Sequence, residues 1–173
     1  MQTIQIQYHK TRLAEFVLGS LNNELCLCDF RYRKLRAQVD ERIKRVANAE
    51  FVEQDTPLLA ATRTQLDEYL LGKRREFDLP LKLLGSAFQQ QVWQALLDVP
   101  YGSTTSYQAI GEAIGNAKAV RAIGTANGAN AIAIIVPCHR VIGRDGSLTG
   151  YGGGLALKQK LLNLEQSQFF LAP

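Results

Sequence analysis

A cysteine, a histidine and an arginine stand side by side at Cys138, His139 and Arg140. They follow an apolar run, residues 131–136, which we interpret as a buried strand or extended segment, and Pro137, whose fixed φ and missing N–H end that run. A proton acceptor and a positive charge beside a thiol lower its pKa from about 8.5. The stretch therefore predicts a reactive cysteine at the floor of a pocket.

A histidine that acts as a base needs a group that orients it, and a carboxylate is the usual one. Glu165 is the acid of the second half that we expect to face inward, because it follows the core-like Leu161 and Leu162 on one predicted helix. Adjacent side chains on a regular strand point in opposite directions, so proton transfer from Cys138 to His139 would need a kink or a bridging water. The residues predict a Cys138–His139–Glu165 relay.

The elements before the cysteine read as helices. Ser86 and Gln89 form a capping box at the start of one helix. Two short helices follow, the first ending near Gly115 and the second spanning about residues 118–129, where small residues surround the long side chain of Arg121. This spacing is typical of a helix-turn-helix, although corners of paired helices also occur in proteins that bind no nucleic acid.

A glycine-rich loop, residues 150–154, precedes the last predicted helix, residues 155–165. It lacks the lysine and hydroxyl spacing of a phosphate-binding loop. We interpret it as a segment whose backbone N–H groups approach a flat ligand closely, where any Cβ would obstruct. A flexible linker is the alternative interpretation.

The first half carries no catalytic motif that we can identify and reads as a supporting domain. Three strands are expected within residues 1–30, with a turn at 19–23, followed by helices at 31–49 and 57–71 and an extended piece at 77–83. The basic residues of the first helix indicate either a solvated face or a surface toward DNA.

Composition narrows the class of protein. The chain has 173 residues, 46% of them hydrophobic, and a net charge of +4, which is compatible with a polyanionic partner but weak as a sign of one. An odd number of cysteines, three, fits a reducing compartment. No signal-like or membrane-spanning run is present in the sequence, so we expect a soluble cytoplasmic protein, with access to the nucleoid if it is bacterial.

Cys26 and Cys28 share one face of a predicted strand, and with His9 they could bind zinc. No further cysteine or histidine pair completes four ligands. We therefore expect small buried core residues here and no metal.

From Ser86 to Glu165 the chain resembles the catalytic domain of the O6-alkylguanine-DNA alkyltransferases, also called methylated-DNA–protein-cysteine methyltransferases. The resemblance rests on the strings FQQQVWQAL, YGSTTSYQAIGEAIG, AVRAIGTANGAN, IIVPCHRVIGRDGSLTGYGGG and LLNLE. It implies a two-domain α/β protein. Residues 1–84 would form a supporting, ribonuclease H-like α/β domain with antiparallel strands. Residues 85–173 would form a mostly helical, winged-helix-like domain with a helix-turn-helix, which binds DNA and accepts the alkyl group.

The resemblance also implies roles for single residues. Cys138 would take the alkyl group from guanine O6, His139 would deprotonate it through a water, and Glu165 would hold the imidazole. Tyr107 would hydrogen-bond or protonate the leaving guanine and help to rotate its 3′ phosphate. Asn130 would tie the second helix of the pair to the cysteine segment.

Two further groups of residues follow from the same resemblance. Arg121 would be the finger that enters the space left by an extruded base. The DNA-binding positions would be Thr105, Ser106, Tyr107, Lys118, Ala119, Arg121, Thr125, Ala126, Asn127 and Gly128. The alkyl pocket would be lined by Pro137, Val141, Tyr151, Gly152, Gly153 and Gly154. Some relatives have a serine at the position of Gly152, so only a backbone contribution is expected there, and Arg140 would be structural.

The implied function is DNA repair that uses no cofactor. The protein would extrude O6-alkylguanine, chiefly O6-methylguanine, and would transfer the alkyl group irreversibly to Cys138, once per molecule. O4-methylthymine is a second candidate substrate. The partner would be double-stranded DNA of any sequence, with no membrane involved, and the protein would be a monomer in solution, with clustering on DNA left open. A non-catalytic binder of alkylated DNA is an alternative that the presence of Cys138 disfavours. A cysteine hydrolase would leave Arg121 without a role.

Overall fold

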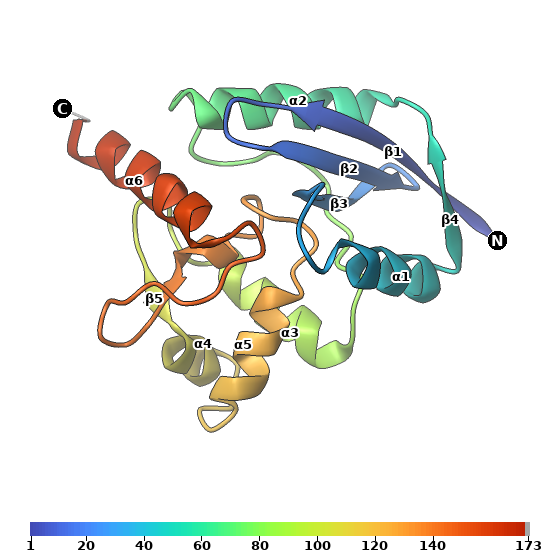
Figure 1. The fold of residues 1–173 in the computed structure, drawn as a ribbon. Coiled ribbons are helices and arrows are strands. Elements are labelled where there is room, and N and C mark those ends of the chain that lie inside the picture. Colours follow the sequence, from blue (N-terminus) through green and yellow to red (C-terminus); the bar gives the residue numbers. More distant parts are fainter. Residues whose placement is uncertain (172–173) are drawn as a thin grey trace. The chain divides into compact units, whose positions relative to one another are not determined.

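The structure is a computed structural model that describes residues 1–171 (Figure 1). The chain forms two compact units, of which the first ends at Gly85 and the second begins at Ser86. This division lies one residue after the expected one. Within residues 1–171 no helix combines the length and the apolar composition that crossing a membrane requires.

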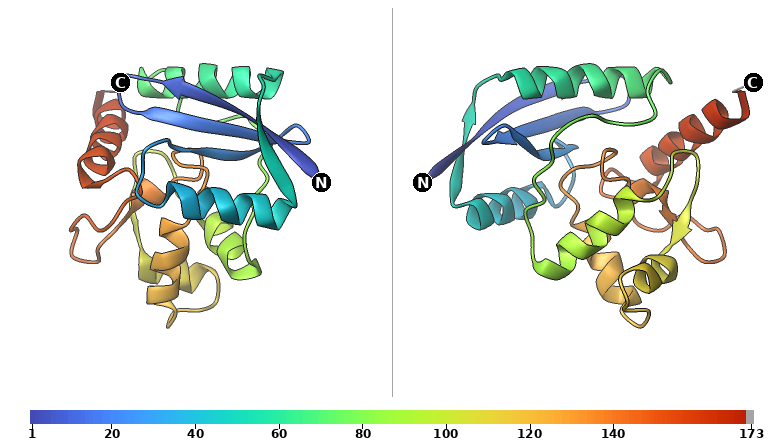
Figure 2. Two further views of the ribbon diagram at one scale, coloured as in Figure 1. Left: turned by 45° about the vertical axis from the view of Figure 1, so that its right-hand side comes forward. Right: turned by 180° about the vertical axis from the view of Figure 1, so that it is seen from behind.

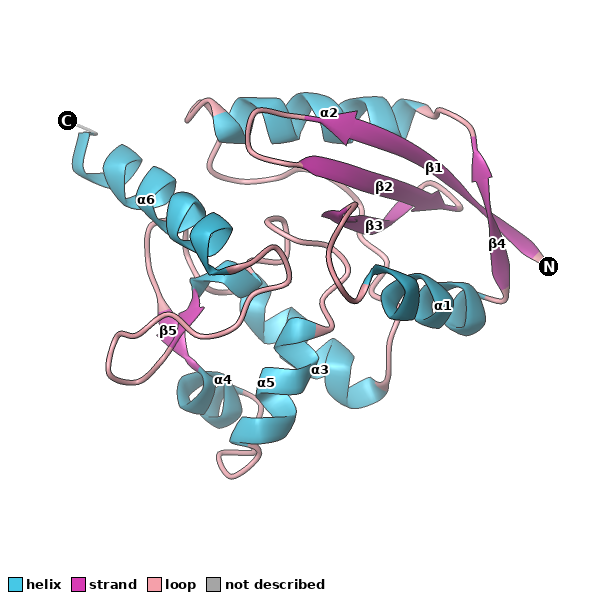
Figure 3. Cartoon of the chain, in the orientation of Figure 1, coloured by secondary structure: helices cyan, strands magenta, loops and turns pink. Residues whose placement is uncertain are grey.

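The first unit is built on a four-stranded sheet in the order β3-β2-β1-β4 (Figure 3). Strands β1 (Gln2–Lys10), β2 (Glu15–Leu21) and β3 (Glu24–Phe30) lie where the alternating sequence predicted strands, and they pair antiparallel, as the family resemblance implied. The expected turn at 19–23 is shorter, because β2 continues through Leu21 and only Asn22 and Asn23 turn, with φ of 51° and 65°. Two residues with positive φ match the twist of a tight hairpin.

The expected helix at 31–49 is shorter at both ends, and the sequence reading missed a strand after it. Helix α1 spans Arg36–Ala47 and ends at Asn48, which adopts a left-handed conformation with φ of 49°. Strand β4 (Ala49–Glu53) follows and pairs parallel with β1. The expectation of antiparallel strands is therefore wrong at this edge, and the sheet is mixed.

Helix α2 (Pro57–Leu70) packs against β1, β2 and β3, and α1 lies on the other side of the sheet (Figure 2). The side chain of Thr56 caps α2 by accepting a hydrogen bond from the N–H of Leu59, and proline occupies the first turn. The expected extended piece at 77–83 forms no strand of its own. It makes one bridge, between Leu81 and Leu25 of β3.

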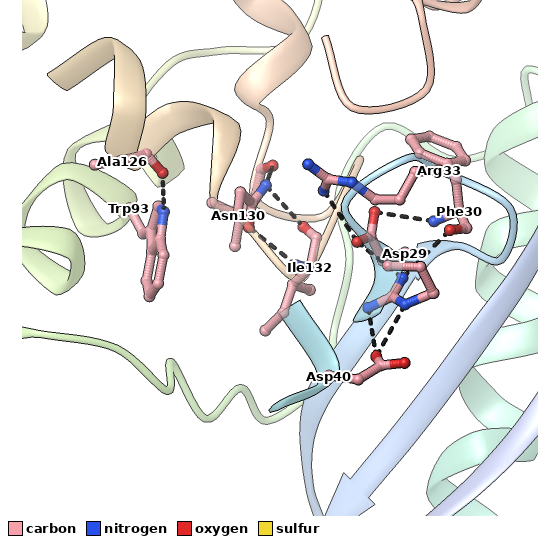
Figure 4. Close-up of polar contacts among 10 residues, drawn as sticks. Asp29, Phe30, Arg33, Asp40, Trp93, Ala126, Asn130 and Ile132 are labelled. Atoms are coloured by element: carbon pink, nitrogen blue, oxygen red, sulfur yellow. Dashed lines mark hydrogen bonds and ion pairs between the residues drawn. The ribbon is translucent and has the colours of Figure 1, made fainter. Parts of the chain in front are cut away.

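The arginines that begin the basic helix are used within the first unit. Asp29, 1% exposed, accepts hydrogen bonds through Oδ2 from Arg33 at 3.1 Å and from Arg36 at 3.0 Å (Figure 4). Arg36 also pairs with Asp40 at 2.8 Å. These two side chains therefore balance buried and half-buried carboxylates and do not form a basic surface toward DNA.

The second unit contains helices α3 (Ala87–Leu97), α4 (Tyr107–Ala113), α5 (Val120–Gly128) and α6 (Leu155–Leu171). The capping box of Ser86 and Gln89 is confirmed at the start of α3. The indole Nε1 of Trp93 donates to the carbonyl of Ala126 at 2.8 Å, which fixes α3 against α5 (Figure 4). Helix α6 continues beyond its expected end at Glu165.

The turn between α4 and α5 is set by glycine. Gly115 has φ of 74°, and the N–H groups of Gly115 and Asn116 donate to the carbonyls of Glu112 and Gly111, which is a Schellman motif. A Cβ on Gly111 would stand 2.9 Å from the carbonyl oxygen of Asn116, so the turn can close only over a glycine. Lys118 lies in this turn and not in the second helix, which begins at Val120.

Candidate active site

The segment before the cysteine is not the expected strand. Residues 131–136 are buried but form successive turns, and Ile134 has φ of 71°. The amide of Asn130 holds these turns, because its Oδ1 accepts from the N–H of Ile132 at 3.0 Å and its Nδ2 donates to the carbonyl of Val136 at 2.8 Å (Figure 4). Asn130 thus fixes the backbone that leads into Pro137 from the end of α5.

Cys138, His139 and Arg140 form one turn of 3-10 helix, η1, and all three are buried, with 6%, 0% and 7% of their surfaces exposed. A 3-10 helix has about three residues per turn, so successive side chains diverge by about 120° and do not point in opposite directions as on a strand. The backbone is therefore kinked at the cysteine, which is one of the two conditions under which Cys138 could pass its proton to His139.

Glu165 on α6 is 1% exposed and receives four hydrogen bonds. His139 Nε2 lies 2.6 Å from its Oε2. Arg140 donates from Nε at 2.8 Å and from Nη2 at 3.1 Å. The N–H of Gly102 donates at 3.3 Å. The structure thus brings together His139 and the acid that the sequence assigned to it, and it adds Arg140 as a second partner.

This arrangement fixes the charges of the pair. Burial alone would raise the pKa of Glu165, but the hydrogen bonds and positive charge of His139 and Arg140 outweigh it and lower that pKa to about 2. Burial lowers the pKa of His139 more than the hydrogen bond and charge of Glu165 raise it, and the charge of Arg140 lowers it further. A neutral imidazole beside a carboxylate is the result.

The tautomer follows from the contacts. Because an ionised carboxylate only accepts hydrogen bonds, the neutral His139 carries its proton on Nε2 and donates it to Glu165. Nδ1 is then the basic nitrogen, and it is buried with no hydrogen-bond partner among residues 1–171. The arrangement supplies a proton acceptor on the residue next to the thiol of Cys138.

Arg140 was expected to be structural, and its contacts are of that kind. Besides Glu165, it donates from Nη1 to the carbonyl of Val99 at 2.7 Å. It therefore ties the end of α3 to the carboxylate that orients His139. A buried arginine of this kind is needed to keep Glu165 ionised, since an unpaired buried charge is costly.

Lys158 is a residue of this region that the sequence reasoning missed. It is 0% exposed, and its Nζ donates to the carbonyls of Val141 at 2.6 Å and Thr149 at 3.0 Å. The signal was present in the sequence, because Lys158 is spaced by three, four and seven residues from Leu161, Leu162 and Glu165 and so shares their face of α6. A lysine on a core-facing stripe indicates an internal partner.

Tyr107, the first residue of α4, points its hydroxyl at Thr149, and the two oxygens are 2.6 Å apart. The short strand β5 (Thr105–Ser106) pairs parallel with β6 (Val141–Ile142), directly after the cysteine turn. This pairing brings Tyr107 toward the segment that carries Cys138, although Tyr107 and Cys138 are 31 positions apart in the sequence.

The expected DNA-binding residues differ in exposure, and they lie on β5, on α4, and on α5 with the turn before it. Exposed positions recur at helical spacing and are Lys118, Arg121, Thr125 and Gly128. Ala119, Thr105, Ser106 and Tyr107 are half-buried, and Ser106 caps α4. Ala126 and Asn127, also expected at this surface, are 2% and 4% exposed and belong to the stripe that packs inside the unit.

Of the expected pocket residues, Pro137 and Val141 are buried next to the cysteine turn, and the loop residues Tyr151, Gly152 and Gly153 are half-buried. Gly154 has φ of 93°, donates its N–H to the carbonyl of Tyr151 at 2.9 Å and accepts from the N–H of Lys158 at 3.1 Å. The loop therefore continues into α6 in a defined turn, which disfavours the flexible-linker interpretation.

The alternative of zinc in the first unit has no matching geometry. Among residues 1–171 no group of three or more His, Cys, Asp or Glu side chains is arranged to hold a metal ion. His9 instead pairs with Asp67 at 2.8 Å. Burial raises the pKa of Cys26 to about 12 and raises that of Cys28 as well, which is the behaviour of core thiols.

Both units of the chain match models of known protein families. The family model of the 6-O-methylguanine DNA methyltransferase DNA binding domain matches residues 87–167, and that of the ribonuclease-like domain of the same methyltransferases matches residues 13–83. A methylated-DNA–protein-cysteine methyltransferase from Mycobacterium tuberculosis is 59% identical over 104 residues, which are 60% of this chain and 63% of that protein. The match thus spans less than two thirds of that relative's length.

Other relatives are matched over more of their length. The constitutive methylated-DNA–protein-cysteine methyltransferase of Bacillus subtilis is 50% identical over 117 residues, which are 67% of this chain and 71% of that protein. The crystal structure of Mycobacterium tuberculosis OGT in complex with DNA is similar with a TM-score of 0.80 and 38% identity, and the match covers 96% of this chain and 94% of that one.

Proposed function

Because the chain belongs to the 6-O-methylguanine DNA methyltransferase family, we propose that it repairs DNA by moving the alkyl group of O6-alkylguanine onto its own Cys138. The observation that carries this proposal is the state of His139. Its Nε2 lies 2.6 Å from Oε2 of Glu165, which accepts the Nε2 proton in a hydrogen bond. Its buried Nδ1 is then free to accept a proton, on the residue next to the thiol.

The transfer balances in atoms and charge. The thiol proton of Cys138 passes to Nδ1 of His139 through a bridging water, and the thiolate sulfur attacks the alkyl carbon in line with the bond to O6. The S–C bond forms as the C–O6 bond breaks, and the electron pair stays on guanine. Guanine then gains a proton, for which the hydroxyl of Tyr107 is the proposed donor, and the proton that His139 took from the thiol returns through water to the Tyr107 phenolate, so that both side chains end neutral. The products are unmodified guanine and a thioether.

A thioether is a stable end product, so each molecule reacts once. Nothing in the site regenerates the thiol, since water attack at an unactivated thioether carbon has no leaving group that the protein stabilises. Cys138 is in this sense a consumed acceptor, and the stoichiometry is one alkyl group per chain. O6-methylguanine is the proposed main substrate, and O4-methylthymine, an alkylated oxygen of the same kind, is a second one to be tested.

DNA would bind at α4 and α5, which we propose to be a helix-turn-helix. Lys118 and Arg121 are exposed on the outer face of α5 and its preceding turn, next to Thr125 and Gly128. Few side chains there could read bases, so phosphate contacts would dominate the affinity and binding would be independent of sequence and weakened by salt. The known DNA complex of the Mycobacterium tuberculosis protein supports the same partner here.

The target base must leave the duplex before Cys138 can reach it, and extrusion costs a few kcal/mol of stacking and pairing. Arg121 is the proposed finger that fills the vacated space. The first unit, with its mixed sheet and two helices, would be the supporting ribonuclease H-like domain, for which the ribonuclease-like family model is the support. The protein would work as a monomer in the compartment that holds the DNA.

The test is incubation with a duplex oligonucleotide that carries O6-methylguanine labelled in the methyl group. The expected result is one label per chain, recovered on the peptide that contains Cys138. Cys138→Ala should bind the duplex as well as the wild type does and take up no label. Binding by the wild type without label transfer would favour a non-catalytic binder, and more than one turnover per chain would overturn the consumed-acceptor mechanism.

A further inference from the structure

Thr149 lies in the loop between β6 and α6 and has no role in the transfer described so far. Its Oγ1 is 2.6 Å from the hydroxyl oxygen of Tyr107, and either atom could be the donor. Both side chains are half-buried. A contact of this length between two hydroxyls is a hydrogen bond of good geometry.

Each partner of this hydrogen bond is held from another side. Lys158, which is buried, donates to the carbonyl of Thr149 at 3.0 Å and to that of Val141 at 2.6 Å, so it anchors the loop at Thr149 itself and at the strand from which the loop starts. The ring of Tyr107 lies against Gly124 of α5, where an added Cβ would stand 3.8 Å from it. The contact therefore joins two independently fixed groups.

We propose that Thr149 is a positioning residue for Tyr107 in the alkyl transfer, an inference that rests on the proposed function. Its hydroxyl donates to the phenol oxygen, which leaves the phenol proton directed at the base. A hydroxyl that accepts a hydrogen bond is polarised and donates its own proton more strongly. Thr149 would thus fix the direction of the proton that the leaving guanine receives.

The chain offers a matched pair of substitutions. Thr149→Val keeps the shape and removes the hydroxyl, whereas Thr149→Ser keeps the hydroxyl and removes the methyl group. In single-turnover transfer from a labelled O6-methylguanine duplex, T149V should react about 2- to 10-fold more slowly, the factor of one ordinary hydrogen bond. T149S should recover most of the wild-type rate. The reverse order of the two variants would overturn the proposal.

A double-mutant cycle shows whether Thr149 acts through Tyr107. Tyr107→Phe removes the phenol hydroxyl and should slow transfer by itself. T149V should then add no further loss in the Y107F background, because the proton that it orients is gone. An equal slowing by T149V with and without the Tyr107 hydroxyl would show that Thr149 acts by another route.

A second measurement does not depend on transfer. In protein labelled with tyrosine 13C at Cζ, the carbon that bears the hydroxyl, the signal of Tyr107 among the six tyrosines is identified by its loss in Y107F. T149V should shift this signal, and T149S should leave it near its wild-type position. An unshifted signal in T149V would refute the contact. If the wild type transferred no label, the proposed function would fail, while this signal would still decide whether Thr149 holds Tyr107.

Discussion

Replacement of Glu165 by glutamine tests the centre of the site, because it removes one charge and little volume. The carboxylate accepts hydrogen bonds from His139 at 2.6 Å and from Arg140 at 2.8 and 3.1 Å, and its side chain is 1% exposed. A glutamine amide has one acceptor oxygen, and its NH2 group would face donors. The guanidinium of Arg140, whose side chain is 8% exposed, would lose its counter-charge.

The magnitude follows from the burial of this pair. Removal of one partner of a buried ion pair costs about 3–5 kcal/mol, against a total stability of about 5–15 kcal/mol. With a urea m-value of about 2 kcal/mol/M, the unfolding midpoint should fall by about 2 M. Trp93 is the one tryptophan of the chain and is 2% exposed in the second unit, so its fluorescence follows the unfolding of the unit that contains Glu165.

The same substitution should slow alkyl transfer, because glutamine no longer fixes the tautomer of His139. General acid–base catalysis contributes about 10²- to 10⁴-fold, so the rate should fall within that range for protein that is still folded. Glu112→Gln, a change of an exposed acid on α4, is the matched control and should leave the free energy of unfolding within about 0.5 kcal/mol of the wild type. An E165Q protein with the midpoint and transfer rate of this control would refute the reasoning.

Three further predictions use the same structure. Stability should fall as the pH drops below about 6.5 and again from about 4.5 to 2, because His139 and Glu165 have lower pKa values in the folded chain than in the unfolded chain, which therefore binds more protons. About 3 kcal/mol of the loss belongs to Glu165. Urea midpoints measured against pH should therefore lack the fall between pH 4.5 and 2 in E165Q. Arg121→Ala should slow repair of a duplex more than reaction with free O6-benzylguanine, and an equal loss on both substrates would remove the finger assignment. Asn130→Ala, which loses hydrogen bonds to Ile132 and Val136, should destabilise the second unit by about 2–4 kcal/mol, and a urea midpoint like that of the wild type would contradict the role of this amide.

The parts of the fold that the sequence predicted well are those with local causes. The capping box at Ser86 and the left-handed Gly115 each depend on a few neighbouring residues, and both are present where expected. Strand β4 was missed because its five residues alternate weakly and follow a helix whose apolar spacing runs into them. Its pairing with β1 is a long-range contact, which local periodicity does not contain.

The cysteine segment shows the same limit within the site. An apolar run of six residues is compatible with a strand or with any other buried conformation, and periodicity cannot separate them. The side chain of Asn130 decides the outcome by taking the backbone groups of Ile132 and Val136 that a neighbouring strand would otherwise bind. The relay of His139 and Glu165 was accessible to reasoning from residue types, whereas the contact of Tyr107 with Thr149 was not.

The three cysteines of the chain show that burial does not by itself make a thiol reactive. Burial raises the pKa of Cys26 and of Cys28, and the negative charge of Asp29 raises that of Cys28 further. Cys138 is buried as well, but His139 follows it directly. Burial lowers the pKa of Lys158 and a negative charge on Cys138 raises it, so a Cys138 thiolate and the ammonium of Lys158 would stabilise each other. Since Arg140 already balances Glu165, the charge of Lys158 is available to the thiolate. The reactivity of Cys138 therefore depends on which charges remain after the carboxylate has been paired.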